Sequence, residues 1–222
     1  MIQFDKNSFT QFMIEHQIVG FWPEALLLKS GKKSHFYVDW RRASHDAFLL
    51  DQVTDYLVSF LKARDSTCEC LFGVPEGASK TAIIAGFKMA KQASDFAVGS
   101  HQIPMGRGKP KSHGHPADRY FVGMPEGRVW VLEDTVTTGG SLLETVEQLC
   151  LNKVQVAGVV ALTDRQDRTD QNIASKLDEQ FGVKNYAPLS FAKEVLVQIL
   201  AAEQTLSEEL RHHIEKEMTD LY

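Results

Sequence analysis

The chain alternates between helical spacing of hydrophobic residues and short, unbroken apolar runs. Helical spacing predicts helices from Asn7 to about Val19, Asp46 to Arg64, Gly77 to Ala93, and Ser141 to Asn152. Apolar runs predict strands in "CLFGV", "DFAVGS", "RVWVLE" and "VQVAGVVALT", which begin at residues 70, 95, 128 and 154. Strands that alternate with helices favour right-handed βαβ units. The pattern therefore predicts an α/β fold with a mainly parallel central sheet flanked by helices.

Both ends of the chain add to this alternating core. Near the N-terminus, "ALLLKSGKKSHFYVDW" contains two extended runs joined by the turn Ser30-Gly31-Lys32-Lys33, which predicts a β-hairpin. The C-terminal third adds the strand "NYAPL" and helical stretches through Met218. We expect a single domain over 1–222, in which 1–45 form an N-terminal hood, 46–167 the core, and 168–222 C-terminal helices and a strand. Within the core, 103–117 lack apolar periodicity and are expected to form a loop.

Composition narrows the class of protein. With 222 residues, 43% hydrophobic and 24% charged, the chain can bury a sizeable core without metals or disulfides. A net charge of −5 argues against a broad nucleic-acid-binding surface. No basic-then-apolar leader opens the chain and no apolar run reaches the roughly 20 residues that span a bilayer, so we expect no membrane partner. Cys68, Cys70 and Cys150 lack C-x2-C spacing and are expected to be free thiols in a reducing cytoplasm.

The segment "VWVLEDTVTTGGS", residues 129–141, joins a buried strand to a helix through a polar loop. In an open parallel sheet, ligands bind beyond the carboxyl ends of the strands. Gly139 and Gly140 let successive backbone N–H groups converge on an anion, and the following helix adds the positive end of its dipole. The loop suits a phosphate monoester, and its hydroxyl donors are Thr135, Thr137, Thr138 and Ser141.

Glu133 and Asp134 at the end of this strand are unsuited to binding the phosphate, so we expect them to serve another part of the ligand. They could bind ribose hydroxyls, organise Mg²⁺, or stabilise positive charge developing on a sugar ring. The chain has no G-x4-GK[ST] loop and no G-x-G-x-x-G after a strand, which argues against the nucleotide sites that those motifs build. The alternative interpretation of residues 129–141 is a solvated strand end followed by a glycine turn, without a function.

Three other segments carry chemistry of their own. Lys29 beside the hairpin turn could pair with pyrophosphate, and an aromatic ring after it could stack on a flat base. Arg165 in "ALTDRQD" ends a buried strand and could bind a planar carboxylate through two parallel hydrogen bonds. The loop "GRGKPKSHGH", residues 106–115, is called the basic loop and could close over a pyrophosphate leaving group. Its basic side chains are Arg107, Lys109, Lys111, His113 and His115. Each segment also has an interpretation without function. The hairpin with Lys29 could be an ordinary basic hairpin, Arg165 could form ion pairs at the surface, and the loop could simply be solvated.

Together these motifs resemble the type I phosphoribosyltransferases, and among them the orotate phosphoribosyltransferases. The resemblance spans roughly residues 20 to 167. It implies transfer of a phosphoribosyl group from phosphoribosyl pyrophosphate to orotate, Mg²⁺ held mainly by the substrate, and a homodimer in which the loop lysine works across the interface. It implies Lys111, His113, Glu133 and Asp134 as catalytic residues. The orotate-binding residues that it implies are Lys29, Tyr37, Val38, Thr137 and Arg165. The residues implied to bind phosphoribosyl pyrophosphate are Lys29, Glu76, Gly77, Arg107, Lys111, His113, Glu133, Asp134, Thr135, Val136, Thr137, Thr138, Gly139, Gly140 and Ser141.

The chain departs from the family's pattern at three places. Glu76-Gly77 stands where family members often have an aromatic residue and a lysine, and Arg107 is followed by Gly108 rather than by a lysine. Val38 replaces a second aromatic residue. These changes remove two positive charges near the expected pyrophosphate and add one negative charge. A phosphoribosyltransferase for another base and a non-catalytic protein that binds the donor are the two alternative functions.

Overall fold

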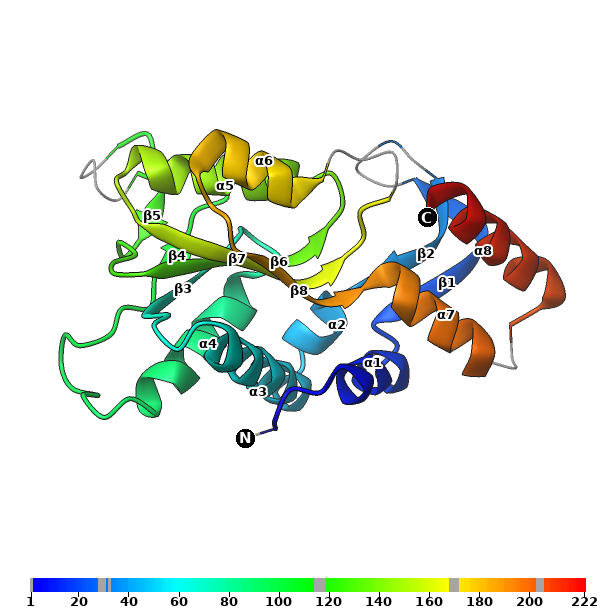
Figure 1. The fold of residues 1–222 in the computed structure, drawn as a ribbon, viewed down its shortest axis with the longest axis horizontal. Coiled ribbons are helices and arrows are strands. Elements are labelled where there is room, and N and C mark those ends of the chain that lie inside the picture. The colour runs from blue at the N-terminus through cyan, green and yellow to red at the C-terminus, as the bar shows by residue number, and fades with distance from the viewer. Residues whose placement is uncertain (1, 28–30, 32, 114–118, 168–171, 203–205) are drawn as a thin grey trace.

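A parallel sheet in the strand order β3-β6-β7-β8 forms the centre of the structure (Figure 1). The computed structural model describes residues 2–27, 31, 33–113, 119–167, 172–202 and 206–222. Strands β6 and β7 are hydrophobic on both faces, as expected for strands covered on both sides by helices. This confirms the predicted α/β fold. The strands are β3 (Cys70–Gly73), β6 (Val129–Val136), β7 (Val156–Asp164) and β8 (Tyr186–Phe191).

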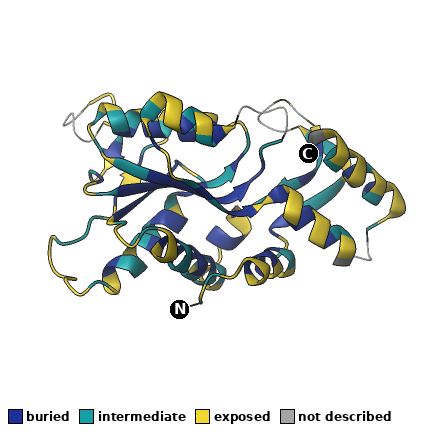
Figure 2. Ribbon diagram, viewed as in Figure 1, coloured by how far each residue is buried: buried dark blue, intermediate teal, exposed yellow. Residues whose placement is uncertain are grey.

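Helices cover both faces of the sheet and divide the core into two layers. Helices α3 (Ala47–Arg64) and α4 (Ser79–Lys91) lie on one face, and α5 (Gly140–Leu151) and α6 (Ile173–Phe181) lie on the other (Figure 1). Successive residues of a strand point to opposite faces. Trp130 and Leu132 therefore join the first core cluster, whereas Val129 and Val131 join the second. Buried residues face the sheet and exposed ones face outward on these helices (Figure 2).

The predicted hairpin is present and lies beside the carboxyl end of the sheet. Strands β1 (Val19–Leu27) and β2 (Lys33–Val38) pair antiparallel, flanked in sequence by α1 (Lys6–Glu15) and α2 (Arg41–Ser44). The indole Nε1 of Trp40 donates a hydrogen bond of 3.0 Å to Thr163 Oγ1 on β7, in the buried core. This bond fixes the end of the hairpin against the sheet.

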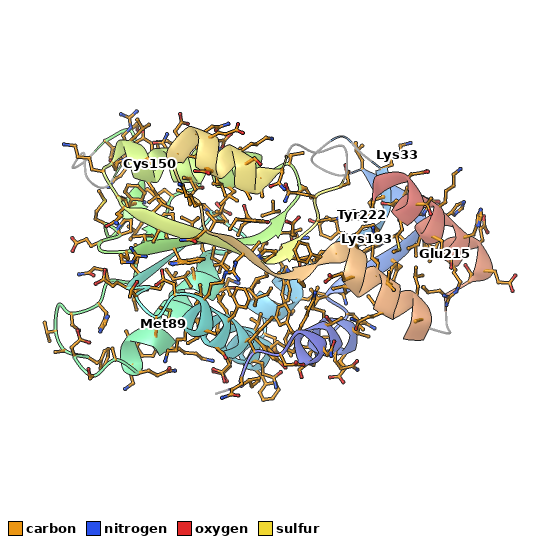
Figure 3. The ribbon with its side chains drawn as sticks, viewed as in Figure 1. Lys33, Met89, Cys150, Lys193, Glu215 and Tyr222 are labelled. Atoms are coloured by element: carbon orange, nitrogen blue, oxygen red, sulfur yellow. The ribbon has the colours of Figure 1, made fainter. Side chains whose placement is uncertain are left out.

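The C-terminal helices pack on the hairpin. Helix α7 (Ala192–Ala202) follows β8, and α8 (Glu208–Leu221) lies along β2. The backbone N–H of His35 donates to Glu217 Oε2 at 2.8 Å, and the His35 and His213 rings stack 4.7 Å apart. Lys193 and Tyr222 lie close together where the two helices meet (Figure 3), and Lys193 Nζ donates to the Tyr222 carbonyl oxygen at 3.2 Å.

One predicted strand is wrong. The segment "DFAVGS", residues 95–100, forms turns instead of a strand. Ser100 N–H donates to Ala97 O, Ser100 Oγ accepts from Ala97 N–H, and Gly99 has a φ of +82°, so the backbone folds back on itself. Val98 is fully exposed. Hydrophobic composition suggested a strand, but these local turns compete with an extended backbone.

The remaining boundaries differ by a few residues from those expected. Helix α1 ends at Glu15 rather than near Val19, because Gln17 adopts a φ of +51° and Val19 already belongs to β1. The loop expected at 103–117 opens with β4 (Met105–Gly106), which pairs with β5 (Phe121–Val122). The three cysteines are free, as predicted. In the described part of the chain, no helix is long and apolar enough to cross a membrane.

Candidate functional site

Three connections meet at the carboxyl edge of the parallel sheet. They follow β3, β6 and β7, because the carboxyl ends of parallel strands share one edge. Gly73 pairs with Leu132, and Val136 pairs with Asp164, so the loop after β6 lies between the other two. The backbone N–H of Arg165 donates to Val136 O at 2.7 Å. The sheet register therefore places Arg165 directly beside the threonine-glycine loop.

The threonine-glycine loop, residues 135–141, has the geometry of an anion site. Gly139 is the N-cap of α5 in the left-handed conformation, with φ +75° and ψ 9°. A Cβ on Gly139 would lie 2.2 Å from Ile173 Cδ1, so only glycine fits there. The first turn of α5 carries no acidic residue, which leaves the positive end of its dipole unopposed. Thr138 and Gly140 are exposed, whereas the Val136 side chain is buried in the core.

The two carboxylates at the end of β6 differ in their surroundings. Glu133 is buried, and its Oε1 accepts the backbone N–H of Asp134 at 3.1 Å. Asp134 Oδ1 accepts the N–H of Thr135 at 2.6 Å. Burial raises the pKa of Asp134, and its hydrogen bonds with Glu133 and with the Thr135 N–H, together with the charge of Arg41, partly offset this rise. Asp134 is thus a carboxylate in a site that disfavours its charge.

Gly77 lies against Asp134. A Cβ on Gly77 would lie 2.3 Å from Asp134 Oδ2, closer than any real contact. The glycine after Glu76 therefore allows the turn after β3 to approach the carboxylate. Glu76 itself is exposed and points toward the basic loop, where a Cβ on Gly108 would lie 2.8 Å from Glu76 Oε1. Sequence reasoning named Gly77 but gave no reason for this contact.

We expect Gly77→Ala to lower kcat/KM by about tenfold or more, because the new methyl group must displace the Asp134 carboxylate from its position. Gly86→Ala is the matched control: Gly86 lies in α4, and a Cβ there meets nothing within 4 Å. Alanine in a helix should leave activity unchanged and raise the melting temperature slightly. Steady-state kinetics and thermal melting of both variants check this. Equal activity of the two variants would show that the Gly77 contact has no role.

Backbone hydrogen bonds hold the first part of the basic loop. The Arg107 N–H donates to Tyr120 O at 2.9 Å, and the Lys111 N–H donates to Arg119 O at 2.8 Å, which continues the β4–β5 pairing. A cavity of about 480 Å³ lies between this loop and the start of α5, lined by Arg107, Gly108 and Ser141 among others.

Lys111 and His113 lie farther along the basic loop. Lys111 is half-buried, and His113 is exposed with Nδ1 3.3 Å from Ser112 Oγ. Within the described residues neither forms an ion pair, so they have no ion pair with Glu133 or Asp134.

Arg165 is buried and held by the hairpin. Its Nη2 donates to Ser34 Oγ at 2.6 Å and to Phe36 O at 3.1 Å, and its guanidinium lies 4.2 Å from the centre of the Phe36 ring. Burial is the main influence and lowers the pKa of Arg165, whereas the charges of Tyr222, Glu217, Tyr37 and Asp167 raise it. Nε and Nη1 have no partner among the described residues, which leaves donors for an anionic ligand.

The hairpin residues divide between the two faces of β2. Phe36 is fully buried under Arg165, whereas Tyr37 points to the opposite face, with its ring centre 6.4 Å from that of Trp22. The Val38 side chain is buried in the core and leaves only its backbone for a ligand. Lys29 lies outside the described residues. Sequence reasoning missed the Ser34 and Phe36 contacts to Arg165, although alternation along the strand indicated which residues face inward.

The described residues contain no group of three or more His, Cys, Asp or Glu that could hold a metal ion. Glu133 and Asp134 supply two carboxylates at one place, and Mg²⁺ usually takes one or two carboxylates together with substrate phosphates. The donor set therefore fits a Mg²⁺ ion that a phosphorylated substrate brings with it.

No family model matches the chain, but curated relatives do. An orotate phosphoribosyltransferase of Schizosaccharomyces pombe is 27% identical over 160 residues, covering 72% of this chain and 71% of the relative. That of Laribacter hongkongensis is 25% identical over 211 residues and covers 92% of each chain. That of Aquifex aeolicus is 30% identical over 152 residues, covering 66% of this chain and 76% of the relative.

Solved structures share the fold. The orotate phosphoribosyltransferase of Francisella tularensis superposes with a TM-score of 0.66 at 18% identity, covering 96% of this chain and 98% of that one. The UMP synthase of Leishmania donovani gives a TM-score of 0.69 at 20% identity and covers 96% of this chain but 42% of that longer one. The Mycobacterium tuberculosis orotate phosphoribosyltransferase in complex with 5-phospho-α-D-ribosyl 1-diphosphate gives a TM-score of 0.56 at 22% identity, covering 86% of this chain and 98% of that one.

The fold, the order of the loops at the sheet edge and these relatives agree. The identity to the Aquifex relative extends over three quarters of that protein, and the likeness to the Francisella structure extends over nearly both whole chains. On these grounds, the chain belongs to the orotate phosphoribosyltransferase family.

Proposed function

We propose that this chain transfers the 5-phosphoribosyl group from phosphoribosyl pyrophosphate to N1 of orotate, giving orotidine 5′-monophosphate and pyrophosphate in de novo pyrimidine biosynthesis. The observation that carries the proposal is the register of β6 and β7, which sets Arg165 beside the loop 135–141. This register brings together two features: a loop that suits the phosphate of a phosphorylated sugar, and a buried arginine that suits a carboxylate. Orotate has such a carboxylate, whereas uracil, adenine, guanine and hypoxanthine do not.

The donor lies along the loop after β6. The N–H groups and hydroxyls of residues 135–141 bind the 5′-phosphate, which leaves the ribose over Glu133 and Asp134. As the bond from C1 to the pyrophosphate oxygen lengthens, positive charge develops on the sugar ring, and the two carboxylates stabilise it. Because these charges are fixed by burial and by hydrogen bonds, little reorganisation is needed during the reaction.

Orotate binds between the hairpin and the end of β7. Arg165 binds its carboxylate and Thr137 orients the base, next to the Val38 backbone. Tyr37 contributes from the other face of β2, where its ring lies 5.8 Å from the Arg41 guanidinium carbon. The anchoring of Arg165 on Ser34 and Phe36 supports this role, because a guanidinium that is already held loses little freedom when it binds.

The pyrophosphate leaves on the side of the basic loop. Lys29, Arg107, Lys111 and His113 bind it, with the turn at Glu76 and Gly77 beside it, and Lys111 or His113 donates a proton to it. Glu133 and Asp134 would hold a Mg²⁺ ion that arrives with the donor, and such an ion would supply positive charge to offset that of the departing group.

A pyrophosphate-release assay tests the function. The protein is incubated with the donor, Mg²⁺ and one base at a time, and we expect release with orotate, none with uracil or the purines, and loss of release with excess EDTA. Release with another base would indicate a different acceptor. Donor binding without release would indicate a non-catalytic donor-binding protein.

We propose a homodimer with a shared active site, in which the basic loop reaches the partner's carboxylates. Two features support it: among the described residues, Lys111 and His113 form no ion pair with the carboxylates of their own subunit, and large apolar side chains are exposed near the base of the loop. Ile103, Met105 and Val122 are about 40% exposed, and Met105 pairs with Val122. An exposed cluster of this kind is typical of an interface.

Mixing two inactive variants tests the shared site. Lys111→Ala and Asp134→Asn should each be nearly inactive alone. After subunit exchange, one site of each mixed dimer regains both residues, so we expect about a quarter of wild-type activity from a random mixture. No recovery, in a mixture that native mass spectrometry shows to contain mixed dimers, would place both residues in the same subunit's site.

We propose that residues 1–222 form one phosphoribosyltransferase domain, with the hood, core and C-terminal region described above. We further propose that the protein works in the cytoplasm. The three free cysteines support this location, and burial raises the pKa of the Cys70 thiol to about 11, which makes it unreactive.

A further inference from the structure

Four acidic residues lie in the segments that end at or follow the strands of this site. Glu133 and Asp134 end β6, Glu76 is exposed in the turn after β3, and Asp39 follows β2. Charges of like sign a few ångströms apart repel strongly in a partly buried site. Positive charge close to these acids favours binding of a polyanion there, in addition to the charge of the basic loop and of a Mg²⁺ ion that the substrate brings.

Arg41 supplies positive charge at this place. Its charge lowers the pKa of Asp134, against the larger raising effect of burial, and the charges of Asp39, Tyr37 and Asp134 raise the pKa of Arg41 in turn. The Arg41 Nε donates to Asp39 Oδ1 at 2.6 Å, and its guanidinium carbon lies 5.8 Å from the centre of the Tyr37 ring. Arg41 thus lies against the end of the hairpin, and its charge acts on Asp134.

The segment that carries Arg41 is fixed on three sides. The N–H of Asp39 donates to Ile18 O at 2.8 Å, and Trp40 is buried with its indole bonded to Thr163. On the other side, Lys80 Nζ donates to Ser44 O at 3.4 Å, which ties α2 to the helix that follows Gly77. Such anchoring holds a side chain in place before a ligand arrives.

The end of the Arg41 side chain is available to a ligand. The side chain is 67% exposed, and among the described residues its Nη1 and Nη2 have no hydrogen-bond partner. The neighbouring Arg42 is also exposed, but its Nη1 donates to Gln17 Oε1 at 3.0 Å. Arg41 is therefore held on Asp39 through Nε, with its planar fork of donors left open.

We propose that Arg41 binds the pyrophosphate group of the phosphoribosyl donor and offsets the repulsion from Glu76 and Asp134. The inference rests on the proposed function, because the loop 135–141 holds the 5′-phosphate and so directs the C1 substituent to the far side of Asp134. The Gly77 turn lies against Asp134, and the helix after this turn is tied through Lys80 to Ser44 O of α2, the helix that begins with Arg41. Arg41 is a substrate-contacting residue, and a guanidinium fork matches phosphate oxygens better than an ammonium does.

Calorimetric titration with pyrophosphate and Mg²⁺, in the absence of any base, tests the assignment. We expect Arg41→Gln to weaken pyrophosphate binding by roughly tenfold or more, as for loss of a charged hydrogen bond. The matched control Arg42→Gln removes the same charge one residue away and should stay within about twofold of wild type. Arg41→Lys keeps the charge without the fork and should lie between wild type and Arg41→Gln. Equal losses in Arg41→Gln and Arg42→Gln, or no loss in either, would overturn the assignment.

Kinetics separate this inference from the proposed function. Arg41→Gln should raise the KM for the donor by about the factor by which it weakens pyrophosphate binding, and it should leave the KM for orotate within about twofold of wild type. A raised orotate KM with unchanged pyrophosphate affinity would move Arg41 to the base site and overturn the proposal. If wild type binds pyrophosphate through Arg41 but releases none with orotate, the acceptor is wrong and Arg41 keeps its role. If wild type does not bind pyrophosphate at all, the donor site fails, and the Arg41 assignment fails with it.

Discussion

Asp134→Asn is expected to lower kcat by about 10²- to 10³-fold, the usual effect of removing one preorganised electrostatic contact to a transition state. Asparagine keeps the size of the side chain and can still accept a hydrogen bond from the Thr135 N–H, but it carries no charge to stabilise the sugar cation. The measurement is steady-state turnover with saturating donor and orotate. Asp178→Asn, an exposed residue on α6, is the control and should turn over like wild type.

The same substitution should not destabilise the fold. Burial raises the pKa of Asp134 above the ordinary value of 3.8, so the folded state binds more protons than the unfolded state. The ionised carboxylate therefore lowers the free energy of unfolding as the pH rises above about 4. Asparagine lacks this penalty, so the variant should melt at or above the wild-type temperature at pH 7, by a margin that is smaller at pH 4.

The pH dependence of turnover gives a second readout of Asp134. Only its ionised form stabilises the cation, so wild-type kcat should fall as the pH drops through the raised pKa, and this limb should be absent from the small residual activity of Asp134→Asn. Wild-type turnover in the variant, or an unaltered acid limb, would sink the role assigned to this carboxylate. A variant that is inactive but melts well below wild type would point instead to a structural role.

Arg165→Ala is expected to raise the orotate KM by roughly tenfold to a hundredfold and the donor KM by less than about threefold. The reason is that Arg165 supplies charged hydrogen bonds to a carboxylate that the donor does not have. Initial rates over a grid of both substrate concentrations separate the two constants. Similar effects on both substrates would count against carboxylate recognition.

Because Arg165 also holds the hairpin, the experiment needs a control for that contact. Ser34→Ala removes the hydroxyl that accepts from Arg165 Nη2 and leaves the guanidinium in place. If Arg165 acts by binding orotate, Ser34→Ala should change the orotate KM far less than Arg165→Ala. If the two variants behave alike, the hairpin attachment rather than the charge accounts for the effect.

The structure shows where two of the residues that depart from the family's pattern, Glu76 and Gly77, lie. Glu76 is exposed beside Gly108, so the negative charge that the sequence adds lies at the base of the basic loop rather than on the carboxylates. Gly77 occupies a place where a larger residue would collide with Asp134. The charge of Arg41 also acts on Asp134 and lowers its pKa, against the larger raising effect of burial.

The fold and the loop after β6 could be predicted because their signals are local. A strand covered on both faces is apolar throughout, and the residues of the loop 135–141 are contiguous, so their types and spacing describe an anion site without further information. The carboxyl ends of parallel strands also meet at one edge, which was sufficient to expect Arg165 near that loop. The strand expected at 95–100 failed for the converse reason, because hydrophobic composition alone does not provide a partner strand.

By itself, the sequence determined the α/β fold, the phosphate loop with its carboxylate pair, and an arginine at the neighbouring strand end. Only the tertiary structure decided which side chains surround them: Gly77 against Asp134, Ser34 and Phe36 under Arg165, and Trp40, next to Arg41, bonded to Thr163 on β7. Ser34 and Arg165 are 131 residues apart in the chain. Contacts over such separations depend on how the hairpin docks on the sheet, and no local pattern of residues records that docking.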